Sequence, residues 1–254
     1  MKFQIWQQYF LSNQNHFNHL DWADNQPLTA EEKNTITSSI RQFQRGEHSE
    51  GKHFLQFATT MNDETYIEAV RVFIKEEQDH AAVLGKFMDL HQINKLNKDW
   101  LDNTFRWLRK LAGLEGTITV LLTAEIVSMI YYKALHSATR SYLLQQVCEQ
   151  VLVDEEMHLR FQSYALQTLY KRKPGIAVQL SGLLHKILMT GTIVMVWFYH
   201  KKVLQAGRYN FPSFFTNVLK EFGKCKKMIA GKVTCTPVSD SLSIRAKEIL
   251  SQVY

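Results

Sequence analysis

Residues 73–88 read FIKEEQDHAAVLGKFM, and residues 151–166 read VLVDEEMHLRFQSYAL. Each stretch contains a Glu-x-x-His pair, Glu77–His80 in the first and Glu155–His158 in the second. Side chains at positions i and i+3 share one face of a helix, so each pair offers a carboxylate and an imidazole to the same point. Apolar residues at helical spacing surround both pairs, which predicts two long helices with these polar groups on their inner faces.

Two readings of these buried pairs are open. A buried glutamate or histidine without a partner is costly to desolvate, and a metal ion compensates both groups. The alternative is a pair of buried Glu–His hydrogen bonds without metal. Because two pairs occur at matching positions on successive helical hairpins, the pattern favours metal. Four neighbouring acidic residues point away from the apolar stripes and are predicted to be solvated: Glu76, Asp79, Asp154 and Glu156.

Two other helices are expected to supply single carboxylates. Glu125 lies 30 residues before Glu155, and position 128 is serine, so its helix offers a carboxylate and no imidazole. Glu47 lies 30 residues before Glu77 and Glu50 lies 27 before it. Both candidates flank the inward direction of their helix; the spacing favours Glu47, and Glu50 remains the alternative.

Several residues near these carboxylates have two readings. Gly46 and Gly51 bracket Glu47 and Glu50, which indicates either close packing against another helix or a kink that re-aims a ligand. His53 is interpreted as incidental or as a support for a ligand. Aromatic residues near the centre and in the helices are interpreted as core: Trp100, Trp107, Tyr132 and Trp197.

Few prolines and glycines and long runs of helix formers predict an all-α protein. Caps and periodicity place four central helices at about 29–61 (Thr29 and Glu32 as a capping box), 64–91 (Asp63 as cap), 117–137 after Gly113 and Gly116, and 142–170 (Ser141 as cap). Other helices are expected through Trp100 and Trp107, at 176–204, at 211–222 and from Asp240. The predicted organisation is an aromatic packing segment (1–28), a four-helix body (29–171) and a basic helical extension packed on the body (172–254).

The charge is unevenly distributed along the chain. Residues 171–254 contain 14 Lys and Arg against 3 Asp and Glu, a net +11, whereas residues 1–170 contain 16 against 21, a net −5. Such a region favours an anionic partner, either nucleic acid, a membrane surface, or an acidic carrier or substrate; the alternative is a solvated basic tail.

Cysteine usage indicates the redox setting of the chain, and hydropathy indicates whether it spans a membrane. Three cysteines without a CxxC pair, and no visible export signal, favour thiols that are packed or free in a reducing, cytoplasmic setting. The apolar run 187–199 is only 13 residues long, which predicts a buried helix rather than a membrane span; interfacial membrane contact is the alternative because its flanks are basic.

Over about residues 29–171 the chain resembles the ferritin-like di-iron carboxylate superfamily. This resemblance implies an antiparallel four-helix bundle with a two-metal site. The candidate metal ligands are Glu47, Glu50, Glu77, His80, Glu125, Glu155 and His158. It also implies two Fe ions, for which Mn or Zn could substitute, that reduce O2 between them and oxidise a nearby substrate. Carboxylate and imidazole ligands suit Fe or Mn, and no thiolate set favours zinc or an iron–sulfur cluster.

Three functions are compatible with these features. The first is an O2-dependent di-iron oxidase or hydroxylase that acts on a small or carrier-bound substrate, with an electron donor that the sequence does not name. The second is a ferroxidase or iron-handling protein. The third is a metal-stabilised binding module that engages RNA, an acidic protein or a membrane surface through residues 171–254. A homodimer is the default assembly.

Overall fold

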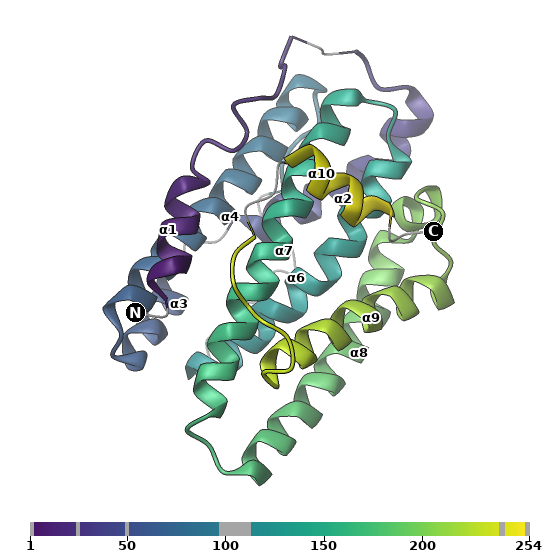
Figure 1. The fold of residues 1–254 in the computed structure, drawn as a ribbon. Helices are drawn as coiled ribbons and strands as arrows, with labels where there is room; N and C mark the ends of the chain where they lie inside the picture. Colours follow the sequence, from purple (N-terminus) through teal and green to yellow (C-terminus); the bar gives the residue numbers. More distant parts are fainter. Residues whose placement is uncertain (1–2, 24–25, 49–50, 97–112, 239–241, 252–254) are drawn as a thin grey trace.

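The structure is a computed structural model that describes residues 3–23, 26–48, 51–96, 113–238 and 242–251 (Figure 1). Every regular element in these ranges is a helix and none is a strand, which confirms the predicted all-α class. Four long helices contact one another in a closed ring, α2 with α4, α4 with α7, α7 with α6 and α6 with α2. Their bounds are α2 Ala30–Glu47, α4 Glu64–Leu90, α6 Gly113–Ala138 and α7 Tyr142–Tyr170.

The predicted caps begin three of these helices. The Thr29 hydroxyl accepts the Glu32 N–H, the Asp63 carboxylate accepts the Thr65 and Tyr66 N–H groups, and the Ser141 hydroxyl accepts the Leu144 N–H. Only half of the expected capping box forms, because the Glu32 carboxylate accepts hydrogen bonds from Thr139 and the Arg140 N–H instead. That carboxylate therefore ties the start of α2 to the turn between α6 and α7.

The predicted single helix over 29–61 is wrong. The chain forms α2, then α3 (Lys52–Ala58) and the 3-10 turn η1 (Thr59–Met61). Gly51 precedes α3 with φ +64°, and a Cβ there would lie 2.5 Å from the Ile74 side chain. A left-handed backbone and close packing therefore both require glycine at this position, whereas Gly46 has open space around it.

Other helix bounds differ from prediction by a few residues to two turns. α6 begins at Gly113, where φ is +62°, so Gly116 lies inside the helix. α9 (Phe211–Ile229) continues seven residues beyond its expected end, and α10 (Leu242–Ser251) begins close to the expected position. The helix predicted through Trp100 and Trp107 lies outside the described residues.

The N-terminal segment packs on the body as expected. Phe3, Trp6 and Phe10 of this segment are fully buried, and α1 (Gln4–Ser12) lies against α4. Ile5 is exposed. Cys148, Cys225 and Cys235 are all buried and free of disulfides, which confirms the packed-thiol prediction.

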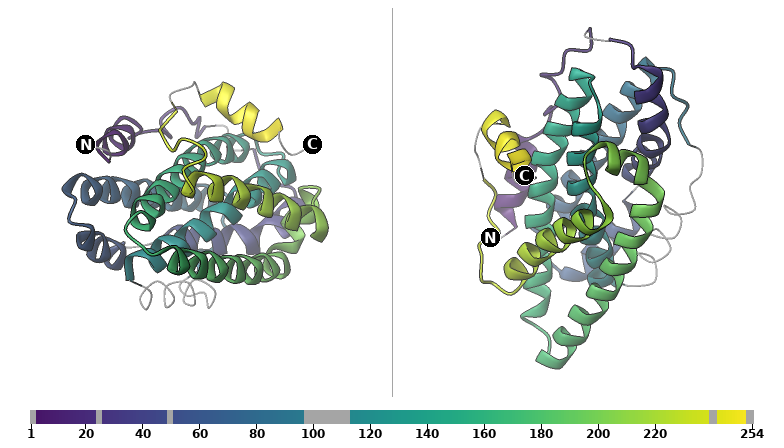
Figure 2. Two further views of the ribbon diagram at one scale, coloured as in Figure 1. Left: turned by 60° about the horizontal axis from the view of Figure 1, so that its bottom comes forward. Right: turned by 90° about the vertical axis from the view of Figure 1, so that its right-hand side faces the viewer.

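In the part of the chain that the structure describes, two helices are long and apolar enough to cross a membrane by length and composition alone. In α6, 83% of the most apolar 18-residue stretch is buried, as expected for a helix in the core. In α8 (Gly175–Ala206), only 33% of the corresponding stretch is buried. α8 packs on α2 and α6, and α9 packs on α6, α7 and α8; Figure 2 shows both along one side of the four helices. The prediction that residues 187–199 are buried is therefore wrong for one face of α8, although Trp197 on the other face is buried as expected.

Candidate metal centre

Helices α4 and α7 bring the two Glu-x-x-His pairs together at the centre of the four helices. Glu77, His80, Glu155 and His158 each place one oxygen or nitrogen so that all four atoms lie within 4.8 Å of one another. The side chains of His80, Glu155 and His158 are 0% exposed and that of Glu77 is 13% exposed. Water therefore has little access to this group.

Both histidines direct the same ring nitrogen at the carboxylates. The Nδ1 atom of His158 lies 2.9 Å from Glu77 Oε1 and 3.6 Å from Glu155 Oε2. The Nδ1 atom of His80 lies 4.0 Å from Glu77 Oε1 and 4.0 Å from Glu155 Oε1. Glu77 and Glu155 thus lie between the two imidazoles.

These converging atoms are the ones that lack hydrogen bonds. Glu77 Oε1, both Glu155 carboxylate oxygens and both Nδ1 atoms are buried without a hydrogen-bond partner among the described residues. The 2.9 Å approach of Glu77 to His158 is not aligned for a hydrogen bond. Leaving one buried polar atom unsatisfied costs roughly 1–3 kcal/mol, more for a charged group. Five such atoms aimed at one point fit a cation better than they fit an empty core.

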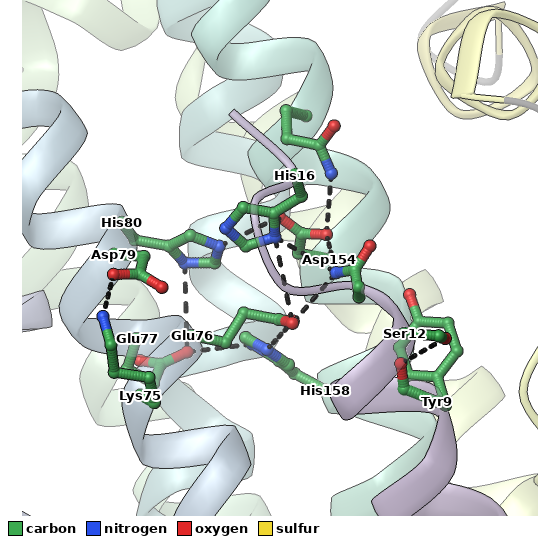
Figure 3. Close-up of polar contacts among 12 residues, drawn as sticks. Tyr9, Ser12, His16, Lys75, Glu76, Glu77, Asp79, His80, Asp154 and His158 are labelled. Atoms are coloured by element: carbon green, nitrogen blue, oxygen red, sulfur yellow. Dashed lines mark hydrogen bonds and ion pairs between the residues drawn. The ribbon is translucent and has the colours of Figure 1, made fainter. Parts of the chain in front are cut away.

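The opposite nitrogen of each imidazole is held by a carboxylate from the other helix (Figure 3). Asp154 Oδ2 lies 3.2 Å from His80 Nε2, and Glu76 Oε1 lies 3.0 Å from His158 Nε2. A carboxylate can only accept, so Nε2 carries the proton and a neutral imidazole keeps its lone pair on Nδ1. This carboxylate–histidine arrangement is how proteins fix the tautomer of metal-bound histidines.

The prediction that Glu76 and Asp154 are solvated is therefore wrong. Glu76 is 4% exposed and Asp154 is 0% exposed. The other two residues of that set do lie nearer the surface, where Asp79 pairs with Lys75 and Glu156 pairs with Arg160. A signal was present in the sequence, since an acidic residue precedes the paired glutamate in both stretches.

The segment after α1 closes this outer side of the site. Asn13 Nδ2 donates to Glu76 Oε2 and to Asp154 Oδ1, both at 2.9 Å, and so links the two supporting carboxylates. Gln150 also donates to Asp154 Oδ1, at 2.8 Å, and His16 Nδ1 lies 3.2 Å from Asp154 Oδ2. Sequence reasoning missed Asn13 and His16, because nothing in helical periodicity relates a loop to a distant helix face.

Glu47 and Glu125 come to the same centre from α2 and α6. Both are buried, at 8% and 4% exposed. Burial raises the pKa of each carboxyl well above its usual range, and the nearby charges of Glu77 and Glu155 raise it further. The structure thus gathers four carboxylates, one from each of the four helices.

The remaining residues predicted near the site have mixed outcomes. Tyr132 is buried in the core as predicted, but its hydroxyl also donates to Glu47 Oε1 at 2.9 Å, so it is a hydrogen-bond partner as well as a core residue. His53 is exposed on α3, in keeping with an incidental role. Glu50 lies outside the described residues.

Without a cation, both imidazoles of the cluster take up a second proton and become positively charged. Burial favours neutral imidazole, but the bond to Asp154 and the charges of Asp154 and Glu77 outweigh it and raise the pKa of His80 to about 9. Burial acts likewise on His158, and Glu77, Glu155 and Glu76 raise its pKa well above the ordinary value. Burial also disfavours the Glu77 carboxylate, but the two histidines outweigh it and lower its pKa. In the absence of metal ions, these protons therefore supply the positive charge that compensates the buried carboxylates.

The donor set indicates which ions fit. Carboxylate oxygens and imidazole nitrogens suit iron and manganese, and no thiol is among the clustered residues.

No family model, curated protein or solved structure matches the chain. The interpretation of the centre therefore depends on its own geometry and chemistry.

Proposed function

We propose that the chain is a ferritin-like, non-haem di-iron protein that activates O2 to oxidise or hydroxylate a small or carrier-bound substrate. The observation that carries this proposal is that Glu77, His80, Glu155 and His158 each place one oxygen or nitrogen within 4.8 Å of the others, and that their inward atoms are buried without a hydrogen-bond partner among the described residues. The outer nitrogens of both histidines already have carboxylate partners, so the inner nitrogens are oriented for a ligand that the protein does not itself supply.

Charge supports two metal ions rather than one. Glu47, Glu77, Glu125 and Glu155 together carry four negative charges when ionised, and burial of that charge without compensation is prohibitive. Two divalent cations balance the four carboxylates, and the two neutral histidines give each cation one nitrogen ligand. One glutamate from each of two helices and a Glu-x-x-His from each of the other two is the ligand pattern of di-iron carboxylate proteins.

Each residue then has a role. His80 and His158 would each hold one ion through Nδ1, and Glu77 and Glu155, whose carboxylates lie between the imidazoles, would also be ligands. Glu47 and Glu125 would complete the set from α2 and α6. Two iron ions bound by such ligands supply the electrons that reduce O2.

Residues around the ligands keep the centre dry and fixed. Phe73 and Phe10 lie against the His158 ring, with centroids 4.7 and 6.1 Å away, and exclude water from that side. Tyr132 holds the Glu47 carboxylate, while Asp154 and Glu76 hold the imidazoles. A dry, preorganised site would limit side reactions of the metal centre with solvent. The basic residues after position 170 support an anionic or carrier-bound substrate.

The test is O2 consumption by anaerobically purified protein loaded with Fe(II), followed with an oxygen electrode and by visible absorbance. We expect rapid uptake of O2 and an absorbance change in the parent chain and in Glu156→Gln, a neighbouring control that pairs with Arg160 near the surface. Glu155→Gln should lose both signals.

The opposite pattern would contradict the proposal, namely iron bound in the parent chain without O2 uptake, or uptake that Glu155→Gln retains. Continued O2 uptake in proportion to added Fe(II), with no organic substrate, would instead assign a ferroxidase role to the same centre.

A further inference from the structure

One face of α8 exposes a long series of large apolar side chains. Of the fourteen exposed large hydrophobic residues among those described, seven lie on this helix. They are Ile176, Leu180, Leu183, Leu184, Ile187, Val194 and Phe198. Ile176 and Phe198, at the two ends, are 80% and 72% exposed. Scattered exposed apolar residues are ordinary, but a contiguous series on one element marks an interaction surface.

Their spacing places all seven on a single stripe. At 100° per residue, the seven directions fall within about 100° of one another. The buried residues of α8, such as His185, Met189 and Val196, point to the opposite side, toward α2 and α6. From 176 to 198 the stripe is about 33 Å long at 1.5 Å per residue. α8 is thus apolar on both faces, but the neighbouring helices cover only one of them.

Basic residues stand at both ends of this stripe. The exposed Lys171 and Arg172 precede α8, where the neighbouring Lys173 pairs with Glu115, and the exposed Lys201 and Lys202 follow Phe198 within about one turn. The chain has no Asp or Glu between Glu156 and Glu221. The exposed Lys186 lies beside the stripe, so the surface that α8 presents is apolar along its length, with positive charge at its ends and on one flank.

This combination favours one occupant over the others. A second copy of the chain packed antiparallel on the stripe would bring Lys171 and Arg172 of one copy against Lys201 and Lys202 of the other, so like charges would meet at both ends. A membrane-crossing α8 would have to leave its contacts with α2, α6 and α9. A helix lying in the plane of a lipid surface keeps those contacts, buries the apolar face and places cations at the phosphates.

We infer that α8 docks the protein on an anionic lipid surface, with the stripe from Ile176 to Phe198 inserted at the level of the headgroups and upper acyl chains. The lysines and arginine at its ends bind the lipid phosphates. The four-helix body stays in water, with its metal centre carried next to the membrane. This inference does not depend on the reaction that the metal centre performs.

Vesicle flotation of the full chain tests the inference. We expect the protein to float with vesicles of phosphatidylcholine mixed with phosphatidylglycerol and to bind pure phosphatidylcholine more weakly, because the basic ends contribute only on the anionic surface. Combined Leu184→Gln, Ile187→Gln and Phe198→Gln substitutions should weaken binding by at least about tenfold. Tyr142→Gln, at a 61% exposed site at the start of α7, is the control that should bind normally.

A second measurement locates the lipid contact. Phe198→Trp should add a tryptophan whose fluorescence is quenched by phosphatidylcholine brominated near the headgroup, and Tyr142→Trp should add one that is not quenched. Both variants replace an exposed aromatic residue, so folding is not at issue.

Three results would overturn the inference. The first is a parent chain that does not float with anionic vesicles. The second is undiminished flotation of the triple variant while its circular dichroism matches that of the parent. The third is light scattering that shows a dimer in the parent chain and a monomer in the triple variant, since the stripe would then be a self-association surface.

Discussion

The metal centre and α8 depart from the ordinary distribution of side chains in opposite directions. Around α4 and α7 the molecule buries carboxylates and imidazoles at its centre, and along α8 it exposes leucine, isoleucine and phenylalanine. Either arrangement is unfavourable in a chain that acts alone in water. The two partners that we propose differ accordingly in chemistry, cations for the centre and an apolar, anionic surface for α8.

α6 is as apolar as α8 and packs beside it, but the two helices differ in burial. α6 is 83% buried in its most apolar window, against 33% for α8, although their mean hydropathies are 1.5 and 1.4. The apolar residues of α6 are accounted for by the core, and those of α8 are not. Glu125, placed in the middle of that core helix, is the exception that the metal centre explains.

The largest predicted effect concerns pH. His80, with a pKa raised to about 9, and His158, with a raised pKa, hold protons at neutral pH in the metal-free protein. Each ion must displace the proton of one histidine to reach its Nδ1, so the apparent affinity for each ion should rise about 10-fold per pH unit, or about 100-fold from about pH 6 to pH 8. Titration with Mn(II), with free Mn(II) measured by electron paramagnetic resonance, tests this slope. A pH-independent affinity would contradict it.

The same raised pKa predicts the stability of the metal-free protein. A group whose folded pKa exceeds its ordinary value stabilises the fold while it is protonated, so the contribution of His80 is complete below its ordinary pKa of 6.5 and is lost as the pH rises through about 9. Thermal unfolding temperatures of the metal-free chain should therefore fall across this window. The metal-loaded chain, in which the ion replaces the protons, should not show that fall.

A smaller effect is expected on removal of a supporting carboxylate. Asp154→Asn keeps the shape of the side chain but weakens its hold on His80 Nε2, and metal affinity should fall about 10- to 100-fold. Asp79→Asn, beside His80 but paired with Lys75 near the surface, is the matched control and should retain the parent affinity. Equal affinities for the two variants would show that Asp154 only fills space.

Charge substitutions probe the other half of the comparison. Lys201→Ala and Lys202→Ala should each weaken binding to anionic vesicles by about 1 kcal/mol, roughly fivefold, and should leave metal content unchanged. The loss should shrink as salt is added, because ions screen exposed charges. Binding that is insensitive to both lysines would assign the interaction to apolar contact alone.

The smallest effect is expected at Tyr132. Tyr132→Phe removes one hydrogen bond to Glu47, which should cost about 1 kcal/mol and weaken metal binding a few-fold. Calorimetric titration with Mn(II) measures the change. A loss as large as that of Asp154→Asn would mean that Tyr132 does more than hold one ligand.

Much of this centre could be predicted from the sequence, because its ligands follow local rules. The i, i+3 spacing places each Glu-x-x-His pair on one face, and the repeated 30-residue interval relates Glu47 and Glu125 to those pairs. Caps at Thr29, Asp63 and Ser141 fix where three helices begin. The all-α class follows from the same periodicity.

What sequence reasoning missed arises between elements. Glu76 and Asp154 are off the inward stripe of their own helices, but each reaches the histidine of the other helix, which a single-helix projection does not show. The bridge made by Asn13 requires a loop to fold over two helices. The exposure of Phe198 could not be foreseen, because hydrophobicity predicts burial without naming what covers the residue.

The most direct test of the central claim is the metal content of the chain expressed with added iron, purified anaerobically and measured by elemental analysis. We expect about two irons per chain, the number that four carboxylates and two histidines would hold, and their loss in Glu77→Ala and Glu155→Ala. Folded parent protein that stays free of metal despite iron loading would contradict the account. The two Glu–His pairs would then be buried polar groups that hold protons in place of metal.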